Sequence, residues 1–321
     1  DCNFDIISFM KAFEIKANGK ILDYRITKNL DLDKVIDFFS QKYKVIKIWQ
    51  ESRHVLGIIE KKNQKLFLKL STTEGISAVT EIEYKWNDEF NRLVTRDINF
   101  WVPKNIDSGF YNQNLFYFIS DYFDGKLLAQ RPLNNTSIKN YSQNLLLIID
   151  LSEFIQKLEV DYLSSKDVEE YKAWFLNKVI SWYKAVPQDV TDKFSLNDLL
   201  TIVKNGYLNL EKKTRHGDFT PWHMFELSNG KIGLIDGEHA MKNGVEYYDI
   251  SYLIQRTFSV LKKPEFAKKI LDILVERKYN MDKLKVILAS RAIGGFLDES
   301  LVSKKPDYTI ANDFKNWVIK L

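Results

Sequence analysis

The feature that most constrains the fold is a change in hydrophobic periodicity near residue 120. Before it, residues 44–49, 55–60 and 65–70 have the pattern of three consecutive strands, and residues 110–119 hold two more. Apolar residues at helical spacing predict a single long helix between them, over 78–94. Because strands precede helices instead of alternating with them, we predict an α+β chain of two lobes.

Most of the remaining chain has a helical pattern. An earlier hairpin is predicted over 13–24, turning at Asn18-Gly19, followed by a helix over 31–43. Helices are predicted over 138–158, 168–186, 196–207, 249–259, 265–277, 281–297 and 310–320. We therefore place an N-terminal lobe at 1–119 with an extension at 1–42, a hinge at 120–125, and a helical C-terminal lobe at 126–321.

Composition narrows the classes of function. Of 321 residues, 45% are hydrophobic and 28% charged, which is enough apolar content for a sizeable core. The net charge of +4 is spread along the chain, so we expect no nucleic-acid partner. Apolar runs are too short to cross a bilayer, so we expect no membrane partner. Cys2 is the single cysteine, which favours a reducing cytoplasm.

Polar residues that could take part in catalysis or metal binding lie close together in one short segment. Three of the four histidines lie between 216 and 239, together with Asp218 and Asp236, each beside a glycine. Residues 224–227 and 231–235 are predicted to form a hairpin that turns at Ser228-Asn229-Gly230. The hairpin would bring Asp236 back beside the loop that holds Asp218 and His223. Phosphoryl transfer uses such a set: one carboxylate takes a proton and another holds a divalent metal.

The string His216-Gly217-Asp218, with Pro221 and His223 after it and Ile235-Asp236 further on, resembles the aminoglycoside phosphotransferase family. The resemblance implies a bilobal protein-kinase-like fold. It also implies that Asp218 is the catalytic base, that Asp236 is the main metal ligand, and that His216 is structural. Asp249 matches the family aspartate that braces this loop.

His223 departs from the family, which has a metal-binding asparagine at this place. Neutral imidazole suits Mn²⁺ or Zn²⁺ better than Mg²⁺. Three interpretations stay open. His223 is a ligand with a shifted metal preference, or Asp236 and Glu238 hold the metal without it, or the protein is a degenerate kinase. We favour an active enzyme, because Lys69, Asp218 and Asp236 are all present.

By the same resemblance, Lys69 at the end of the third strand would hold the nucleotide phosphates and a helix glutamate would orient it. Glu83 shares a helix face with Trp86 and Phe90, so it is predicted to point inward. Glu81 lies on a more polar face and is the alternative. The lysine could also be a strand-end residue that reaches water.

Two further nucleotide contacts are predicted only from the positions of the residues in the expected fold. The loop between the first two of the three strands lacks the glycines of a protein kinase, and Ser52 fits the serine-bearing loop of the family. The neighbouring Arg53 is interpreted as a solvated arginine in preference to a phosphate contact. In the hinge, the Ser120 carbonyl and the Tyr122 N–H are predicted to bind the adenine edge.

Together these observations predict a phosphotransferase that moves the γ-phosphate of ATP or GTP, with Mg²⁺ or Mn²⁺, to a hydroxyl of a small molecule. The alternatives are a nucleotide-binding pseudokinase or interaction module and, ranked last, a metal-dependent hydrolase. The hydrolase would use the cluster of His216, Asp218, His223 and Asp236, but it would leave Lys69 and Glu83 unexplained. The resemblance does not predict an aminoglycoside as the acceptor. Binding an aminoglycoside would need an acidic surface, and the predicted helices carry lysines as well as carboxylates.

Overall fold

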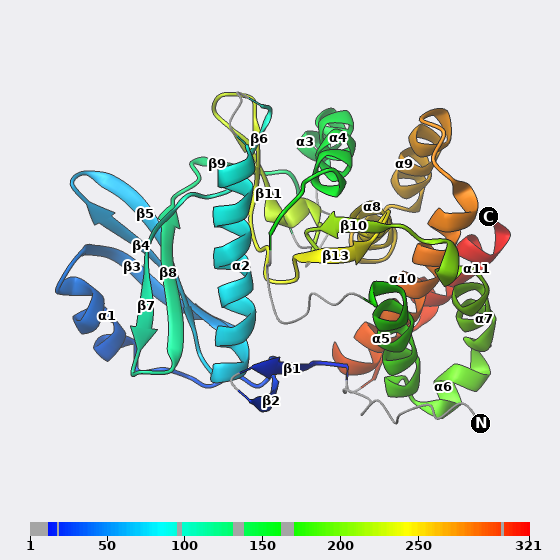
Figure 1. The fold of residues 1–321 in the computed structure, drawn as a ribbon, viewed down its shortest axis with the longest axis horizontal. Helices are drawn as coiled ribbons and strands as arrows, with labels where there is room; N and C mark the ends of the chain where they lie inside the picture. The colour runs from blue at the N-terminus through cyan, green and yellow to red at the C-terminus, as the bar shows by residue number, and fades with distance from the viewer. Residues whose placement is uncertain (1–11, 18, 95–97, 131–137, 162–169, 303–304) are drawn as a thin grey trace.

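A computed structural model describes residues 12–17, 19–94, 98–130, 138–161, 170–302 and 305–321. An antiparallel sheet of five strands in the order β3-β4-β5-β8-β7 forms one end of the molecule (Figure 1). Its strands are β3 (Lys44–Glu51), β4 (His54–Lys61), β5 (Gln64–Ser71), β7 (Asn105–Tyr111) and β8 (Leu115–Asp121). The sheet and the helical half confirm the predicted α+β class, whereas the proposed lobe boundaries stay a prediction.

Two helices pack against this sheet. Helix α1 (Leu32–Ser40) buries Val35 and Phe39 in a small core with the strands. Helix α2 (Glu74–Leu93) begins four residues earlier than predicted, because the Thr73 side chain caps its N-terminus by accepting from the Ile76 N–H at 3.4 Å. Its apolar stripe, which includes Trp86 and Phe90, belongs to the large core that continues into the helical half. Helix α2 thus ties the two ends of the molecule together.

A smaller sheet of four strands holds the predicted hairpin, in the order β6-β12-β11-β9. The hairpin strands are β11 (Met224–Leu227) and β12 (Ile232–Leu234), flanked by β6 (Phe100–Trp101) and β9 (Gly125–Leu127). Strands β10 (Lys212–Arg215) and β13 (Met241–Val245) pair separately. The hairpin is confirmed, and β6, β9, β10 and β13 were not predicted. Strands this short show too few alternations for a period-2 pattern to be recognised.

The helical half has the predicted helices with three differences, and residues 168 and 169 of the helix predicted over 168–186 lie outside the described residues. Its elements are α3 (Lys139–Gln143), α4 (Leu145–Gln156), α5 (Tyr171–Ala185), α6 (Gln188–Lys193), α7 (Asn197–Gly206), α8 (Tyr248–Gln255), α9 (Pro264–Glu276), α10 (Met281–Val302) and α11 (Thr309–Lys320). The helix predicted over 138–158 is interrupted at Asn144, whose side chain donates to the Asn140 carbonyl. Helix α8 continues into a short π-helix, η3 (Arg256–Val260). Helix α6 was not predicted.

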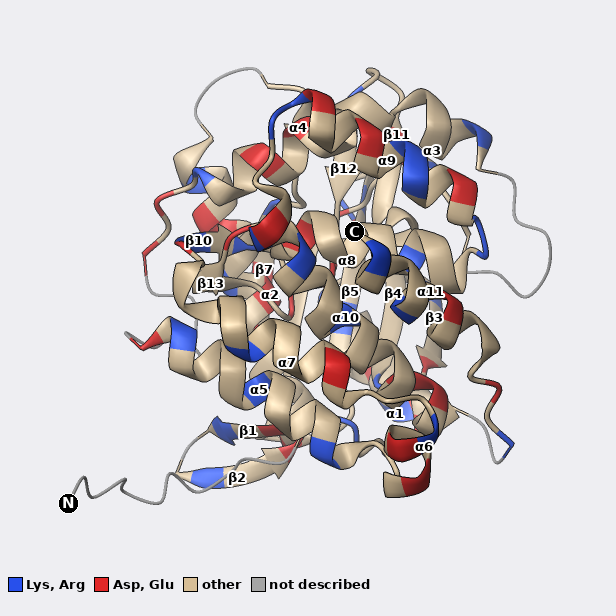
Figure 2. Ribbon diagram, turned by 90° about the vertical axis from the view of Figure 1, so that its right-hand side faces the viewer, with Lys and Arg blue, Asp and Glu red and all other residues tan. Residues whose placement is uncertain are grey.

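The N-terminal hairpin of β1 (Glu14–Ala17) and β2 (Lys20–Asp23) lies below α2, between the two halves (Figure 1). It approaches α2 closely at Gly75, where a Cβ would lie 2.6 Å from the Asp23 carbonyl oxygen. Lysines, arginines and carboxylates intermingle over the helices that face the viewer in Figure 2. Among the described residues, no helix combines the length and the apolar character that a bilayer crossing needs.

Candidate active site

The loop after β10 is shaped by backbone contacts. Gly217 has φ +89°, and a Cβ there would lie 2.2 Å from the His239 carbonyl oxygen, so only glycine fits. The Asp249 carboxylate, in the first turn of α8, accepts from the N–H groups of His216 and Gly217, both at 2.8 Å. Asp249 therefore holds the loop just before Asp218, in the position that the family resemblance implied.

Asp218, His223 and Asp236 come together as the hairpin argument predicted. One ligand atom from each lies within 4.8 Å of the others. His223 Nε2 is 3.2 Å from Asp236 Oδ2, and Nδ1 is 3.7 Å from Asp218 Oδ2. The Ile235 N–H donates to the His223 carbonyl at 3.0 Å, and this bond holds the segment before Asp236 beside His223. Two carboxylates and an imidazole at this spacing suit one divalent cation.

Lys69 links the sheet to this cluster. Its Nζ lies 2.5 Å from Glu83 Oε2 and 2.6 Å from Asp236 Oδ1, and the lysine is buried. The other Glu83 oxygen accepts from the Asp236 N–H at 3.1 Å. Between the two candidates on α2, Glu83 is thus the partner of Lys69, as its helical phase predicted. No described contact joins Lys69 to Glu81.

The charges of these groups depend on one another. Burial acts to raise the pKa of Asp236, but Lys69 and then His223 outweigh it and hold that pKa well below its usual range. Burial acts to lower the pKa of His223, but Asp236 and Asp218 raise it. Burial raises the pKa of Glu83 to about 7 against the opposing effect of Lys69. A metal ion would require neutral His223, so metal binding and protonation compete there.

The predicted phosphate loop is a two-residue turn. Glu51 pairs with His54, which leaves Ser52 and Arg53 between β3 and β4, and Ser52 adopts φ +51°. Arg53 is not the solvated residue that was favoured, because its side chain is 26% exposed and forms an ion pair with Glu238. Glu238 is fully buried, and its carboxylate faces Arg53 and does not join the three-residue cluster.

The predicted hinge follows the strand beside β5. Ser120 is buried in β8, between Phe67 of β5 and Asn105 of β7. Tyr122 is the first residue after Asp121 ends that strand. Both therefore lie at the end of the sheet strand that neighbours the Lys69 strand, and their contact with adenine stays a prediction.

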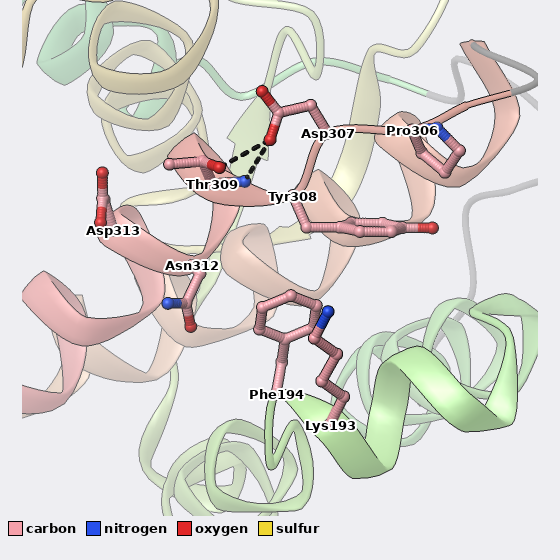
Figure 3. A pocket seen from close by; sticks show the side chains of 8 residues that line it. All are labelled: Lys193, Phe194, Pro306, Asp307, Tyr308, Thr309, Asn312 and Asp313. Atoms are coloured by element: carbon pink, nitrogen blue, oxygen red, sulfur yellow. Dashed lines mark hydrogen bonds between the residues drawn. The ribbon is translucent and has the colours of Figure 1, made fainter.

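A cavity of about 370 Å³ lies elsewhere, between the end of α6 and the start of α11 (Figure 3). Asp307 at its edge accepts from the N–H and the hydroxyl of Thr309. The cavity shares no residue with the cluster around Asp218.

Several solved structures of phosphotransferases have a similar arrangement of elements. A thermostable mutant of aminoglycoside phosphotransferase APH(4)-Ia superposes with a TM-score of 0.64 over 90% of this chain and 98% of the other, at 12% identity. Choline kinase LicA from Streptococcus pneumoniae gives 0.55 over 90% and 97%, at 11% identity. This chain has the aminoglycoside phosphotransferase fold. A GDP complex of an aminoglycoside 2'-phosphotransferase-IIIa mutant gives 0.55 over 91% and 95%, at 14% identity.

The structures therefore share a fold although their sequences are only 11–14% identical to this chain. No protein-family profile matches the chain, and no curated protein matches it by sequence. Related structures were solved with ADP, AMP-PNP or GDP and with hygromycin B, so this fold binds nucleotides and small molecules in those proteins.

Sequence reasoning missed two groups of residues. One is the pairing of Arg53 with Glu238, which lie 185 positions apart. The other is a set of arginines and tyrosines beside the loop that holds Asp218, described below. A sequence signal existed for both: the chain has only nine arginines among its 47 basic residues, and four of them fall in these two groups.

Proposed function

We propose that the protein is a kinase that moves the γ-phosphate of ATP or GTP to a hydroxyl group of a small molecule. The observation that carries the proposal is the position of Lys69 between Glu83 and Asp236, at 2.5 and 2.6 Å. This bridge joins a nucleotide-holding lysine to the cluster that contains Asp218. A hydrolase built on the histidines would leave the bridge without a purpose.

In the proposed reaction Asp218 accepts the proton of the acceptor hydroxyl. The oxygen of that hydroxyl forms a bond to the γ-phosphorus, the bond from this phosphorus to the β,γ-bridging oxygen breaks, and the nucleoside diphosphate leaves. Lys69 holds the nucleotide phosphates, and Glu83 orients Lys69. Asp236 and His223 would hold a divalent cation, which supplies charge neutralisation on the phosphate oxygens.

A nucleotide-binding pseudokinase is the second candidate, and His223 in place of the family asparagine favours it. The two candidates differ in whether nucleotide binding and turnover depend on a divalent metal ion. We expect the melting temperature to rise with ATP or GTP only when Mg²⁺ or Mn²⁺ is present, and Asp236→Asn to remove that dependence.

The same samples are then followed by ³¹P NMR for release of phosphate from the nucleotide, with water as acceptor. Metal-dependent binding with turnover supports the kinase. Metal-independent binding without turnover supports the pseudokinase. The absence of a shift with either nucleotide rejects both.

A further inference from the structure

Beside the catalytic loop, three guanidinium groups alternate with two tyrosine rings. We name this set the arginine–tyrosine cluster; it comprises Arg215, Tyr248, Tyr252, Arg256 and Arg291. Arg215 lies 3.8 Å from the ring centroid of Tyr248, and Arg291 lies 4.2 Å from that of Tyr252. Arg256 lies 4.7 Å from the Tyr252 ring. The residues come from β10, α8, η3 and α10, so only the fold assembles them.

Two of the three guanidinium groups are buried and form no direct ion pair with a carboxylate among the described residues. Arg256 pairs with Asp298 at 2.8 Å and donates to the Tyr252 hydroxyl at 2.7 Å. Arg215 and Arg291 are only 6% and 4% exposed. Within the described part of the chain, neither of these two forms an ion pair with a carboxylate. Burying a guanidinium without an acid is unfavourable, and departures of this kind concentrate at functional sites.

The arginine–tyrosine cluster lies close to the proposed catalytic base. Arg215 precedes Asp218 by three residues, and Asp249 from α8 braces the loop between them. Burial raises the pKa of Tyr252, Arg256 opposes this rise, and Asp218 adds to it. Asp218 is therefore within electrostatic range of Tyr252, and it acts on Arg256 as well.

Resting on the kinase function proposed above, we propose that the acceptor is an anion: a hydroxylated small molecule whose carboxylate or phosphate group binds Arg256 and the rest of the arginine–tyrosine cluster. Guanidinium groups offer paired N–H donors that match the oxygens of carboxylates and phosphates. The chain uses lysine for most of its positive charges but places three of its nine arginines here. A bound anion would supply hydrogen-bond acceptors for these guanidinium groups while its hydroxyl faces Asp218.

The same geometry disfavours cationic acceptors. Ammonium ligands are recognised by open aromatic faces, and here arginines already lie over them. Besides the two tyrosines, Arg291 lies 5.2 Å from the Trp182 ring and Arg215 lies 5.4 Å from the Trp174 ring. An amine or a quaternary ammonium group would meet like charge, which excludes it by repulsion.

The test compares ligands that share one carbon skeleton and differ in charge. Binding of glucose, glucosamine, glucose 6-phosphate and gluconate to the full chain is measured by melting-temperature shift and by calorimetry, without nucleotide. We expect both anions, or one of them, to bind and to raise the melting temperature, whereas glucose and glucosamine do not. Comparison of glucose 6-phosphate with gluconate then shows whether the site prefers a phosphate or a carboxylate group.

Variants assign any binding to the cluster. Arg256→Gln should weaken the anion by about 10- to 100-fold, because a hydrogen bond to a charged group is lost. Arg256→Lys, which keeps the charge and the Asp298 partner, should restore part of the affinity. Arg277→Gln is the matched control, since Arg277 also pairs with carboxylates (Asp150 and Glu153) but lies outside the cluster.

Binding of glucosamine in preference to the anions, or no binding of either anion, overturns the proposal. So does anion binding that Arg256→Gln leaves unchanged while the variant remains folded. The metal–ATP shift is recorded separately for every variant. Its absence in the unmodified protein contradicts the kinase function, whereas its presence without anion binding contradicts only the acceptor class.

Discussion

Asp236 is the residue that joins Lys69 and Glu83 to the cluster of Asp218 and His223. One carboxylate oxygen binds Lys69, the other faces His223, and its N–H donates to Glu83. The residue adopts φ +69°, a conformation that is unfavourable for a residue with a side chain. Such backbone strain persists only where surrounding contacts determine it, and here three contacts do so.

Asp218→Asn is expected to remove most of the turnover and to leave nucleotide binding intact. Asparagine has the same shape but cannot take the acceptor proton, so the rate of phosphate transfer should fall by about 100- to 10,000-fold. Release of phosphate from metal–ATP measures the rate, and the melting-temperature shift measures binding. Asp189→Asn, on α6, is the control. Turnover within a few-fold of the unmodified protein would contradict the assignment of the base.

His223→Asn should change the metal preference. If the imidazole is a ligand, the unmodified protein will favour Mn²⁺ over Mg²⁺ in metal–ATP binding, because imidazole is a poor ligand for the harder ion. Asparagine supplies an oxygen, so the variant should narrow or reverse that ratio. The measurement is the ATP-induced melting-temperature shift over a titration of each metal. An identical ratio in both proteins would show that His223 does not coordinate.

Among the elements, the turn between β3 and β4 and the segment after β12 are coupled by one ion pair. Arg53 reaches from the turn to Glu238, which is fully buried. The second Glu238 oxygen has no hydrogen-bond partner among the described residues. Helix α2 supports the same segment, since a Cβ on Gly237 would lie 2.3 Å from the Trp86 ring. The turn, α2 and the segment after β12 therefore pack as one unit around Lys69.

Arg53→Ala should destabilise the fold more than a surface change does. It leaves the buried carboxylate of Glu238 without its cation, which costs about 3–5 kcal/mol of unfolding free energy. Urea denaturation measures the loss. In the double variant Arg53→Ala with Glu238→Gln, the buried charge is gone, and a large part of the stability should return. Equal stabilities of the single and double variants would mean that water reaches Glu238.

For the whole molecule, the large core runs from α2 into the helices, while a smaller core lies between α1 and the five-stranded sheet. The site lies where the large core meets the sheet, and two histidines are buried there. His216 is fully buried, and burial lowers its pKa to about 3. His54 on β4 is buried as well, and burial, Lys69 and Arg53 lower its pKa well below the usual value. Both shifts favour the neutral imidazole in the folded protein.

Stability should therefore fall on acidification. In the unfolded chain a histidine has a pKa of about 6.5, so below this pH the unfolded state binds a proton that the folded state cannot take up until about pH 3. The contribution of neutral His216 is complete above pH 6.5 and decreases by about 1.4 kcal/mol per unit as the pH falls.

Between pH 6.5 and 5, His216 alone should thus lower the unfolding free energy by about 2 kcal/mol. Urea denaturation at these pH values, compared with His216→Asn, isolates the effect, because carboxylates titrate in both proteins. The variant should have the shallower pH dependence. Parallel curves would indicate that His216 becomes protonated within the fold.

The sequence alone determined the local elements and the pairings that lie close along the chain. Hydrophobic periodicity predicted the strands of the five-stranded sheet, most helices and the inward face of Glu83, because these depend on residues close together in the sequence. The hairpin at 224–235 predicted the meeting of Asp218, His223 and Asp236 for the same reason.

Only the tertiary structure decided the remainder. It paired Arg53 with Glu238, and it assembled the arginine–tyrosine cluster from four elements. Side chains so far apart in the sequence meet only after helices and strands have packed, and no local period records which faces will be opposed. Their geometry is therefore a property of the fold, and with it the charge of the acceptor that we propose.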